Sequence, residues 1–235
     1  MNIALILAGG VDPKFHMEIP KQFVSVYNRP IITYTMEVFQ MNPEIDYIAV
    51  ACLNGWQELV KSYAKQFNIS KLRWLVMGGI RGQDSSYNGI NALYKDCNPD
   101  DLIIIHDSIR PLVSNEIISD SIKTCKKNGM GVAAVCSMDT IMRSSDGKTG
   151  DESINRYEVM RVQTPQTYPL KYLYEAHQLA IEKGIKGNVD TNSMISKLGR
   201  KIYFSKGADI NLKINTVEDV EMFKALYKIR NDKAE

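Results

Sequence analysis

Short apolar segments alternate with helix-like segments along the first part of this chain, and this alternation limits the fold more than any other feature of the sequence. The apolar segments, each long enough for one strand, are residues 3–7, 47–53, 72–77, 102–105 and 132–136. The helix-like segments between them are residues 30–40, 55–66, 85–94 and 115–127. Strands that are apolar throughout and alternate with helices are typical of a parallel sheet covered on both faces. The pattern therefore predicts an α/β fold with a doubly wound, mostly parallel sheet.

The pattern changes between about residues 138 and 166. Residues 139–142 and 157–162 are predicted as short strands on either side of a polar turn at 144–153. Such a hairpin has little core of its own, so we expect this arm to pack on a second copy of the chain, giving a homodimer. We expect residues 1–235 to form a single domain. The elements predicted beyond the arm are helices at 170–182 and 192–198, a strand at 201–204 and a helix from 217.

The charge balance excludes some classes of function. The chain has 235 residues, with 29 Lys and Arg against 27 Asp and Glu, a net charge of +2. A nucleic-acid-binding protein should carry a clear basic excess, so we expect no nucleic-acid partner. The sequence has no signal peptide, and no apolar stretch is long enough to cross a membrane, so we expect a cytoplasmic protein. The four cysteines include no Cys-x-x-Cys pair, and no zinc site is expected.

The first apolar segment ends in Ala8-Gly9-Gly10 and is followed by Lys14 and Lys21. A buried strand that ends in small residues can present bare backbone N–H groups to a polyphosphate, and two cations then lie close by. Glycine allows the backbone to approach phosphate oxygens because it has no Cβ. A tight strand-to-helix turn with unrelated surface lysines would give the same short pattern, so this stretch alone leaves both interpretations open.

Polar residues that can carry chemistry follow other predicted strands. They are Gly78-Gly79 with Asp84-Ser85, His106-Asp107-Ser108 with Arg110-Pro111, Asp139-Thr140, Asn155-Arg156, Gln163-Thr164-Pro165-Gln166 and Asn211-Leu212-Lys213. Ligands bind beyond the carboxyl ends of parallel strands, so we expect these clusters to gather at one edge of the sheet. The cations expected there are Lys14, Lys21, Arg110, Arg156 and Lys213.

Asp107 is the candidate metal ligand of this edge. A carboxylate among cations suits Mg²⁺, which binds through one or two carboxylates plus substrate phosphates. The set fits the attack of one phosphate on another, which requires positioning and charge stabilisation but no nucleophilic side chain. Plainer alternatives stay open: Asp107 could cap a turn, Lys213 could be a surface lysine, and Arg156 could pair with an acid of the hairpin. His106 fits a structural role better than that of a base, and Asp190 fits a helix cap.

In this order, the motifs resemble those of the family of 2-C-methyl-D-erythritol 4-phosphate and ribitol-5-phosphate cytidylyltransferases, over nearly the whole chain. The most specific motifs are Pro20-Lys21-Gln22-Phe23, His106-Asp107 with Arg110-Pro111, Asp139-Thr140-Ile141, Gln163-Thr164-Pro165-Gln166 and Asn211-Leu212-Lys213-Ile214. The resemblance implies a nucleotidyltransferase fold and a homodimer formed through the hairpin arm. It also implies condensation of CTP with a polyol phosphate, with Mg²⁺ as cofactor, giving a CDP-polyol and pyrophosphate.

The resemblance further implies roles for the matching residues. The nucleotide site would be lined by Ala8, Gly9, Gly10, Gly79, Ser85, Asp107 and Ser108, with the cytosine at Gly79 and Ser85 and Mg²⁺ on Asp107. The catalytic cations would be Lys14 and Lys21 on the triphosphate and Lys213 on the α-phosphate. The acceptor phosphate would be bound by Arg110, Thr140 and Arg156, the last two reaching across from the partner subunit.

Departures from the family pattern lie around the phosphate loop and the acceptor pocket. Asp12 replaces a glycine of the family loop, and Lys14 stands where an arginine is usual, which loses the rigid bidentate fork of the guanidinium. Arg81 comes one place early, and Val189 stands where a threonine is typical. These changes bear on the identity of the acceptor more than on cytidylyl transfer.

Several functions compete for this sequence. Among acceptors, ribitol 5-phosphate or a similar linear polyol phosphate for a cell-surface polymer is favoured, and methylerythritol phosphate for isoprenoid synthesis is second. A homologue that binds nucleotide with weak or no turnover is the alternative that Asp12 and Lys14 favour. A dinucleotide-dependent oxidoreductase is disfavoured because the glycines lack the Gly-x-Gly-x-x-Gly spacing.

Overall fold

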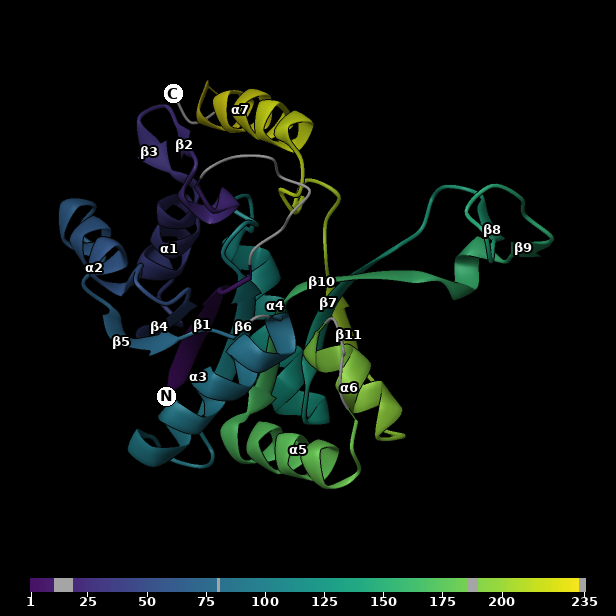
Figure 1. Cartoon of the computed structure of the whole chain (residues 1–235), viewed down its shortest axis with the longest axis horizontal. Helices are drawn as coiled ribbons and strands as arrows, with labels where there is room; N and C mark the ends of the chain where they lie inside the picture. The colour runs from purple at the N-terminus through teal and green to yellow at the C-terminus, as the bar shows by residue number, and fades with distance from the viewer. Residues whose placement is uncertain (11–18, 80, 186–189, 233–235) are drawn as a thin grey trace.

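The computed structural model describes residues 1–10, 19–79, 81–185 and 190–232. Its centre is a seven-stranded sheet with the strand order β11-β7-β10-β6-β1-β4-β5 (Figure 1). The strands of this sheet are β1 (Asn2–Ala8), β4 (Tyr47–Cys52), β5 (Leu72–Met77), β6 (Leu102–Asp107), β7 (Gly131–Cys136), β10 (Met160–Pro169) and β11 (Phe204–Lys206). All neighbours pair in parallel except β10, which runs antiparallel to both β6 and β7. The predicted mostly parallel α/β sheet is confirmed.

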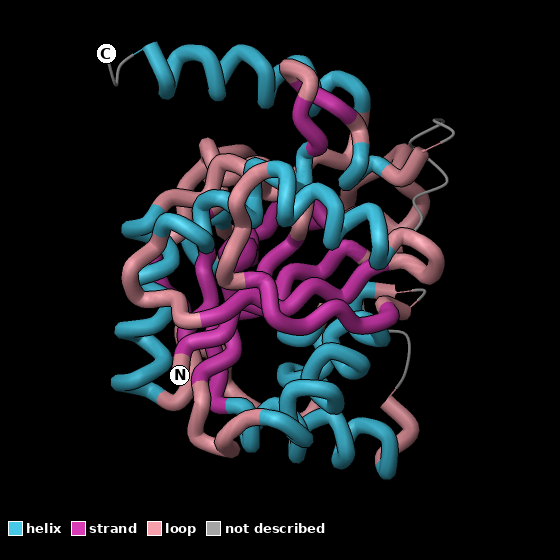
Figure 2. The backbone as a smooth tube through the Cα atoms, turned by 90° about the vertical axis from the view of Figure 1, so that its left-hand side faces the viewer, coloured by secondary structure: helices cyan, strands magenta, loops and turns pink. Residues whose placement is uncertain are grey.

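Helices cover both faces of this sheet (Figure 2). They are α1 (Ile31–Met41), α2 (Gln57–Gln66), α3 (Gly82–Asp96), α4 (Asn115–Asn128), α5 (Leu170–Glu182) and α6 (Thr191–Lys197), whereas α7 (Val217–Asp232) lies further out and packs on α1. Successive residues of β1 point to opposite faces: Ala4 and Ile6 pack in one core with α1, α2 and α4, and Ile3 and Leu5 pack in the other with α3, α5 and α6. A strand that is buried on both sides is generally apolar throughout, and this made the central strands predictable from the sequence.

The register of the central strands fixes where the polar motifs meet. Leu7 of β1 pairs with Asp107 of β6, and Ala8 pairs with Cys52 of β4. Asp107 therefore lies beside the last residues of β1, next to the start of the Gly9-Gly10 loop. This is the carboxyl edge at which an open α/β sheet binds ligands.

The sequence pattern found only the start of β10: the strand predicted at 157–162 covers its first three residues, and residues 163–166 were indicated only as a motif framing the hairpin. The strand lies in the middle of the sheet, with Gln166 opposite Ile105 of β6 and Val132 of β7. Its polar side chains are buried because they hydrogen-bond within the protein, as with Gln166 Nε2, which donates to the Gln163 carbonyl at 3.3 Å. A buried strand with so many polar residues carries no apolar signal.

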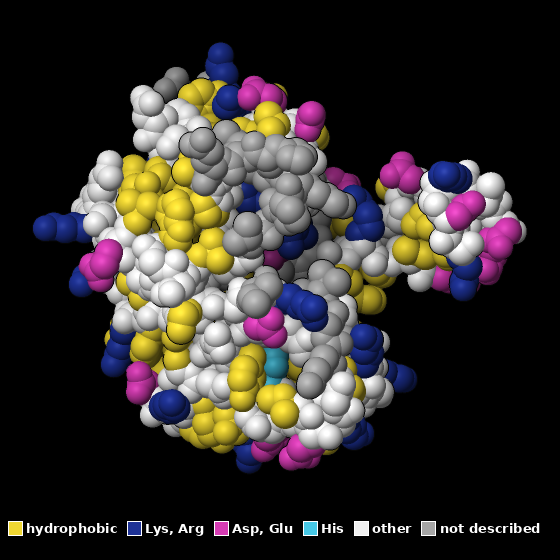
Figure 3. All heavy atoms as spheres, in the orientation of Figure 1, with side chains coloured by type: hydrophobic (Ala, Val, Ile, Leu, Met, Phe, Trp, Pro, Cys, Tyr) yellow, Lys and Arg dark blue, Asp and Glu magenta, His cyan; other side chains and the backbone are white. Residues whose placement is uncertain are grey.

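The arm is a hairpin, but its second strand differs from the prediction. β8 (Ile141–Arg143) pairs with β9 (Glu152–Ile154), so the second strand of the hairpin lies before the predicted one at 157–162. The predicted segment instead begins in the short 3₁₀ turn η3 (Arg156–Glu158) and continues into β10. The turn between the strands is stabilised by Asp146, whose carboxylate accepts from the backbone N–H groups of Lys148 and Thr149, both at 2.8 Å. The arm stands away from the body as a separate lobe that carries charges of both signs (Figures 1 and 3).

Two small elements complete the edge of the sheet that holds the candidate site. The 3₁₀ turn η2 (Lys21–Phe23) leads into a short hairpin of β2 (Ser25–Val26) and β3 (Arg29–Pro30). This hairpin, α1 and α7 share a small apolar cluster in which Tyr34 packs edge-on against Phe223 with their ring centroids 5.2 Å apart. Among the helices that the structure describes, none combines the length and apolar character needed to cross a membrane.

His177 of α5 makes the stability of this fold sensitive to acid. The side chain is buried, and burial lowers the pKa of His177 to about 4. Between pH 6.5 and 4 the unfolded chain therefore binds a proton that the folded chain does not, so stability is lost as the pH falls through that window. We expect wild type to lose about 2 kcal/mol more than His177→Phe on going from pH 7 to pH 5. Urea unfolding of both proteins at the two pH values checks this; equal losses would contradict it.

Candidate functional site

A cavity of about 620 Å³ opens at the carboxyl ends of β1 and β6. Its walls come from the loop after β1, the starts of α3 and α6, the polar part of β10 and the segment before α7. The predicted site residues that line it are Ala8, Gly9, Gly10, Lys21, Ser85, Asp107, Ser108, Arg110 and Lys213. Segments far apart in the sequence thus converge on one cavity, as predicted from their positions at strand ends.

The glycine corner of the cavity leaves no room for side chains. A Cβ on Gly9 would lie 2.1 Å from Ser85 Oγ, and a Cβ on Gly79 would lie 2.1 Å from the Asp84 Cβ. Gly10 has a φ of +100°, a conformation that favours glycine. The Ser85 hydroxyl also accepts a 2.9 Å hydrogen bond from the Gly79 N–H, which fixes the start of α3 against this corner. Gly79 therefore shapes the site without lining the cavity itself.

The segment around Lys21 is tied to the end of β1. Gln22 is buried and donates from Nε2 to the Ala8 carbonyl at 2.7 Å, so the Pro20-Lys21-Gln22 motif packs directly on the strand end. Lys21 Nζ donates to Asn215 Oδ1 at 3.2 Å, and both residues line the cavity. The role of Gln22 as an anchor could not be read from its position in the motif alone.

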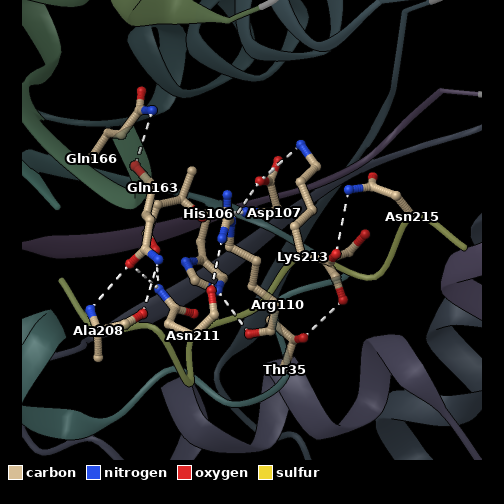
Figure 4. Close-up of polar contacts among 12 residues, drawn as sticks. Thr35, His106, Asp107, Arg110, Gln163, Gln166, Ala208, Asn211, Lys213 and Asn215 are labelled. Atoms are coloured by element: carbon tan, nitrogen blue, oxygen red, sulfur yellow. Dashed lines mark hydrogen bonds and ion pairs between the residues drawn. The ribbon is translucent and has the colours of Figure 1, made fainter. Parts of the chain in front are cut away.

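Asp107 is the centre of the charged groups. Its Oδ2 lies 3.0 Å from Arg110 Nε and 3.0 Å from Lys213 Nζ (Figure 4). Burial works to raise the pKa of the Asp107 carboxyl, but the Lys213 ammonium and the Arg110 guanidinium outweigh it and hold that pKa well below its usual range. The carboxylate is therefore ionised at neutral pH, with 18% of its side chain still exposed to the cavity.

His106, the neighbour of Asp107, has a structural role. The ring is fully buried, packs against Phe39 with their centroids 5.0 Å apart, and has Nε2 3.2 Å from the Arg110 carbonyl. Burial lowers the pKa of His106 to about 4, against a raising effect of the Arg110 carbonyl and Asp107. The neutral imidazole steadies the turn that carries Arg110 and does not face the cavity, in agreement with the sequence interpretation.

A hard divalent cation at Asp107 would need ligands beyond the described protein side chains around it. Among the residues that the structure describes, no three His, Cys, Asp or Glu side chains gather closely enough to hold a metal ion by themselves. Mg²⁺ commonly binds through one or two carboxylates plus substrate phosphates, so one ionised carboxylate in a cavity with cations is compatible with it.

A polar wall formed by β10 and α6 was only partly anticipated. Thr164 accepts from the Asp107 backbone N–H at 3.1 Å and so joins β10 to the end of β6. Asp190 accepts from the Ser193 N–H at 2.8 Å, the predicted helix cap, and it also lines the cavity. Arg81, which the sequence marked as displaced by one place, lines the same cavity at the start of α3.

Some predicted residues are not brought to the cavity within one chain. Thr140 and Arg156 belong to the arm, where the Arg156 guanidinium donates to the Met138 carbonyl at 2.9 Å and lies over the Tyr157 ring. Lys14, Asp12 and Val189 lie outside the described residues.

The chemistry of the described cavity is that of an anion site. Bare backbone at Gly9 and Gly10, the cations Lys21, Arg110 and Lys213, and the ionised carboxylate of Asp107 face a common space. Such a set can hold a polyphosphate and stabilise charge on its oxygens during phosphoryl or nucleotidyl transfer.

Comparisons with known proteins find a family model and relatives that match nearly the whole chain. A family model described as 2-C-methyl-D-erythritol 4-phosphate cytidylyltransferase (IspD) matches residues 2–228. The ribitol-5-phosphate cytidylyltransferase of Lacticaseibacillus paracasei is 41% identical over 228 residues, which are 96% of this chain and 97% of that protein. The 2-C-methyl-D-erythritol 4-phosphate cytidylyltransferase of Clostridium botulinum is 32% identical over 219 residues, 93% of this chain and 94% of that protein.

The fold is also similar to solved structures. The 4-diphosphocytidyl-2C-methyl-D-erythritol synthase of Anaerococcus prevotii matches with a TM-score of 0.80 over 97% of this chain and 96% of its own. At 23% sequence identity this similarity shows the fold alone.

Proposed function

This chain belongs to the 2-C-methyl-D-erythritol 4-phosphate cytidylyltransferase (IspD) family, and on that premise we propose that it transfers CMP from CTP to ribitol 5-phosphate, releasing pyrophosphate and forming CDP-ribitol. The observation that carries the proposal is the convergence of Lys21, Arg110 and Lys213 on one cavity beside the Gly9-Gly10 backbone. A cytoplasmic location follows from the proposal, because CTP is a cytoplasmic metabolite.

The reaction requires one bond to form and one to break. An oxygen of the acceptor phosphate attacks the α-phosphorus of CTP, and the bond from the α-phosphorus to the bridging oxygen breaks as pyrophosphate leaves with the electron pair. The backbone N–H groups at Gly9 and Gly10 and the Lys21 ammonium hold the triphosphate, and Lys213 stabilises charge on the α-phosphate. Ser85, which the Gly79 N–H holds in place, lines the end of the cavity at which the cytosine is proposed to bind, and Ser108 faces the ribose or a phosphate. Positioning and electrostatic stabilisation supply the rate enhancement, with no covalent intermediate.

Mg²⁺ belongs to this proposal as the cofactor that Asp107 would hold. When bound, it would neutralise charge on the phosphate oxygens as a Lewis acid. The support in this chain is the ionised state of Asp107, which its two cationic neighbours maintain.

Ribitol 5-phosphate is favoured over methylerythritol phosphate by the comparison with relatives. The relative named for ribitol 5-phosphate shares 41% of its residues with this chain, and the relative named for methylerythritol phosphate shares 32%.

A homodimer formed through the arm completes the proposal. In one chain the arm exposes the apolar side chains of Met138 and Tyr157, and its Arg156 does not reach the cavity of the same chain. In the proposed dimer, Thr140 and Arg156 of one copy would meet the acceptor phosphate beside Arg110 of the other.

Arg156→Ala tests this part of the proposal. The variant is expected to raise the KM for ribitol 5-phosphate about tenfold or more and to leave the KM for CTP unchanged, because a charge-assisted contact to the acceptor alone is lost. Steady-state kinetics with each substrate varied separately would measure both constants. Arg143→Ala is the matched control, since Arg143 also lies in the arm but pairs with Glu152 at 2.8 Å. Equal effects of Arg156→Ala on both substrates would remove Arg156 from the acceptor site.

The proposed function is tested by measuring pyrophosphate release from CTP and Mg²⁺ with a panel of polyol phosphates and without acceptor. We expect release that depends on ribitol 5-phosphate. Thermal stabilisation by CTP without pyrophosphate from any acceptor would indicate a nucleotide-binding homologue instead. Release with methylerythritol phosphate alone would indicate the isoprenoid activity.

A further inference from the structure

The segment that carries Lys213 runs between β11 and α7 without regular secondary structure. Two backbone hydrogen bonds hold its ends: the Gly207 N–H donates to the Ala134 carbonyl at 3.0 Å, and the Ile214 N–H donates to the Ile109 carbonyl at 2.9 Å. Between these points the path of the chain depends on other contacts. The position of Lys213 Nζ at Asp107 depends on that path.

Side-chain amides supply the contacts that fix the path of the segment between these two points. Gln163 of β10 binds the backbone of Ala208 on both sides, donating to its carbonyl at 2.9 Å and accepting from its N–H at 3.2 Å. Asn211 Nδ2 donates to the Thr164 carbonyl at 2.8 Å and to Gln163 Oε1 at 3.3 Å. Figure 4 shows Gln163, Ala208 and Asn211 side by side next to the charged centre. The segment is therefore held against β10 by amide groups.

Asn211 also contacts the charged centre through its backbone. Its carbonyl accepts from Arg110 Nη1 at 2.7 Å, while Arg110 Nε contacts Asp107. Lys213, two residues further along, reaches the same Asp107 oxygen at 3.0 Å. Asn211 thus connects β10 to Arg110 through its own hydrogen bonds, and to Lys213 through the two backbone links between them.

The buried side chain of Asn211 carries a cost in free energy that its other contacts have to offset. Asn211 is fully buried, and its Oδ1 finds no hydrogen-bond partner among the described residues. A buried unpaired oxygen costs free energy, so its presence calls for another reason. The two hydrogen bonds of the Nδ2 group to β10 provide one.

We propose that Asn211 is a positioning residue that holds Lys213 and Arg110 on Asp107 by fastening their segment to β10. The proposal rests on the proposed function, in which Lys213 stabilises the α-phosphate and Arg110 meets the acceptor. Asn211 itself contacts no substrate. Its effect on turnover passes through Lys213 and Arg110.

A double-mutant cycle with Asn211→Ala and Lys213→Ala separates this role from general stability. We expect Asn211→Ala to lower kcat about 10- to 100-fold and Lys213→Ala to lower it about 10²- to 10³-fold. Because Asn211 acts largely through Lys213, the double variant should be much less impaired than the product of the two factors. Factors that multiply would show that the two residues act independently and would overturn the proposal.

Asn42→Ala is the matched control. Asn42 is also fully buried, and its amide donates to Asn115 Oδ1 at 3.0 Å and accepts from the Glu44 N–H at 2.9 Å. It lies after α1, near the amino end of β1, away from the cavity. We expect a loss of thermal stability comparable with that of Asn211→Ala, with kcat unchanged. An equal loss of kcat in both variants would assign Asn211 to stability alone.

A binding measurement keeps this proposal separate from the proposed function. The affinity for CTP with Mg²⁺ is measured by calorimetry for the wild type, the two single variants of the cycle and the double variant. The double variant is again expected to lose much less affinity than the product of the two single losses. If wild type binds CTP but transfers CMP to no acceptor, the proposed function fails and the CTP cycle decides the role of Asn211. If Asn211→Ala does not fold, the shorter donor in Asn211→Ser is measured instead. The proposal would be overturned by any of three results. These are an Asn211→Ser protein that does not fold, a folded Asn211 variant with unchanged affinity for CTP, and a wild-type protein that does not bind CTP.

Discussion

Asp107→Ala is expected to reduce pyrophosphate release about 10³-fold or more and to remove its dependence on Mg²⁺. The substitution removes the carboxylate at which the metal is proposed to bind, and it leaves the Arg110 and Lys213 cations without their shared counter-charge. The fold should survive, because Arg110 keeps its hydrogen bond to the Asn211 carbonyl and Lys213 is partly exposed to solvent. Coupled detection of pyrophosphate across a range of Mg²⁺ concentrations measures the effect.

Asp101→Ala is the matched control for the Asp107 variant. Asp101 is also a buried carboxylate, but it accepts from the Asn98 N–H at 2.9 Å and contacts the amino terminus at the opposite end of the sheet. We expect this variant to lower the melting temperature without lowering turnover in the folded protein. An Asp107→Ala protein that keeps its activity and its response to Mg²⁺ would mean that the metal is held elsewhere.

Gly9→Ala is expected to weaken CTP binding about 100-fold or more in a protein that still folds. The added Cβ would lie 2.1 Å from Ser85 Oγ and 3.2 Å from the Gly79 carbonyl, so the Ser85 hydroxyl has to move. The shift breaks the contact between Ser85 and the Gly79 N–H, and the new methyl group keeps phosphate oxygens away from the backbone. Calorimetric titration with CTP and Mg²⁺ measures the affinity.

Gly129→Ala controls for the general effect of replacing a glycine. Gly129 ends α4 with a φ of +85° and has open space where a Cβ would lie. Its substitution should cost about 1 kcal/mol of stability through backbone strain while CTP affinity stays unchanged. Wild-type affinity in Gly9→Ala would show that the nucleotide does not approach this corner.

The fold could be predicted where burial dictated composition. The apolar strands β1, β4, β6 and β7 were found close to their observed bounds because a strand covered on both faces admits few polar residues, and the half-buried edge strand β5 was found from its apolar residues as well. Beyond residue 162, β10 was not predicted as a strand because many of its buried side chains are glutamines and threonines, which find hydrogen-bond partners only in the folded chain. The Thr164 hydroxyl, for example, accepts a hydrogen bond from the Asp107 N–H. Tertiary hydrogen bonding of this kind leaves no periodic signal in the sequence.

The candidate site could be predicted in its membership more than in its internal contacts. Lys21, Asp107 and Lys213 follow or precede recognisable elements, so their convergence followed from the rule on strand ends. The contact of Asp107 with Arg110 is local, three residues along the same turn, but its contact with Lys213 depends on the path of residues 207–214, which no local pattern specifies. The same holds for Gln22 and Asn211, whose contacts join segments distant in sequence.

A competition between acceptors tests the central claim most directly. Wild-type protein is mixed with CTP, Mg²⁺ and equal concentrations of ribitol 5-phosphate and 2-C-methyl-D-erythritol 4-phosphate, and the products are resolved by mass spectrometry. The account predicts that CDP-ribitol predominates, with one pyrophosphate released for each CDP-polyol formed. CTP that stays intact, or CDP-methylerythritol as the main product, would contradict it.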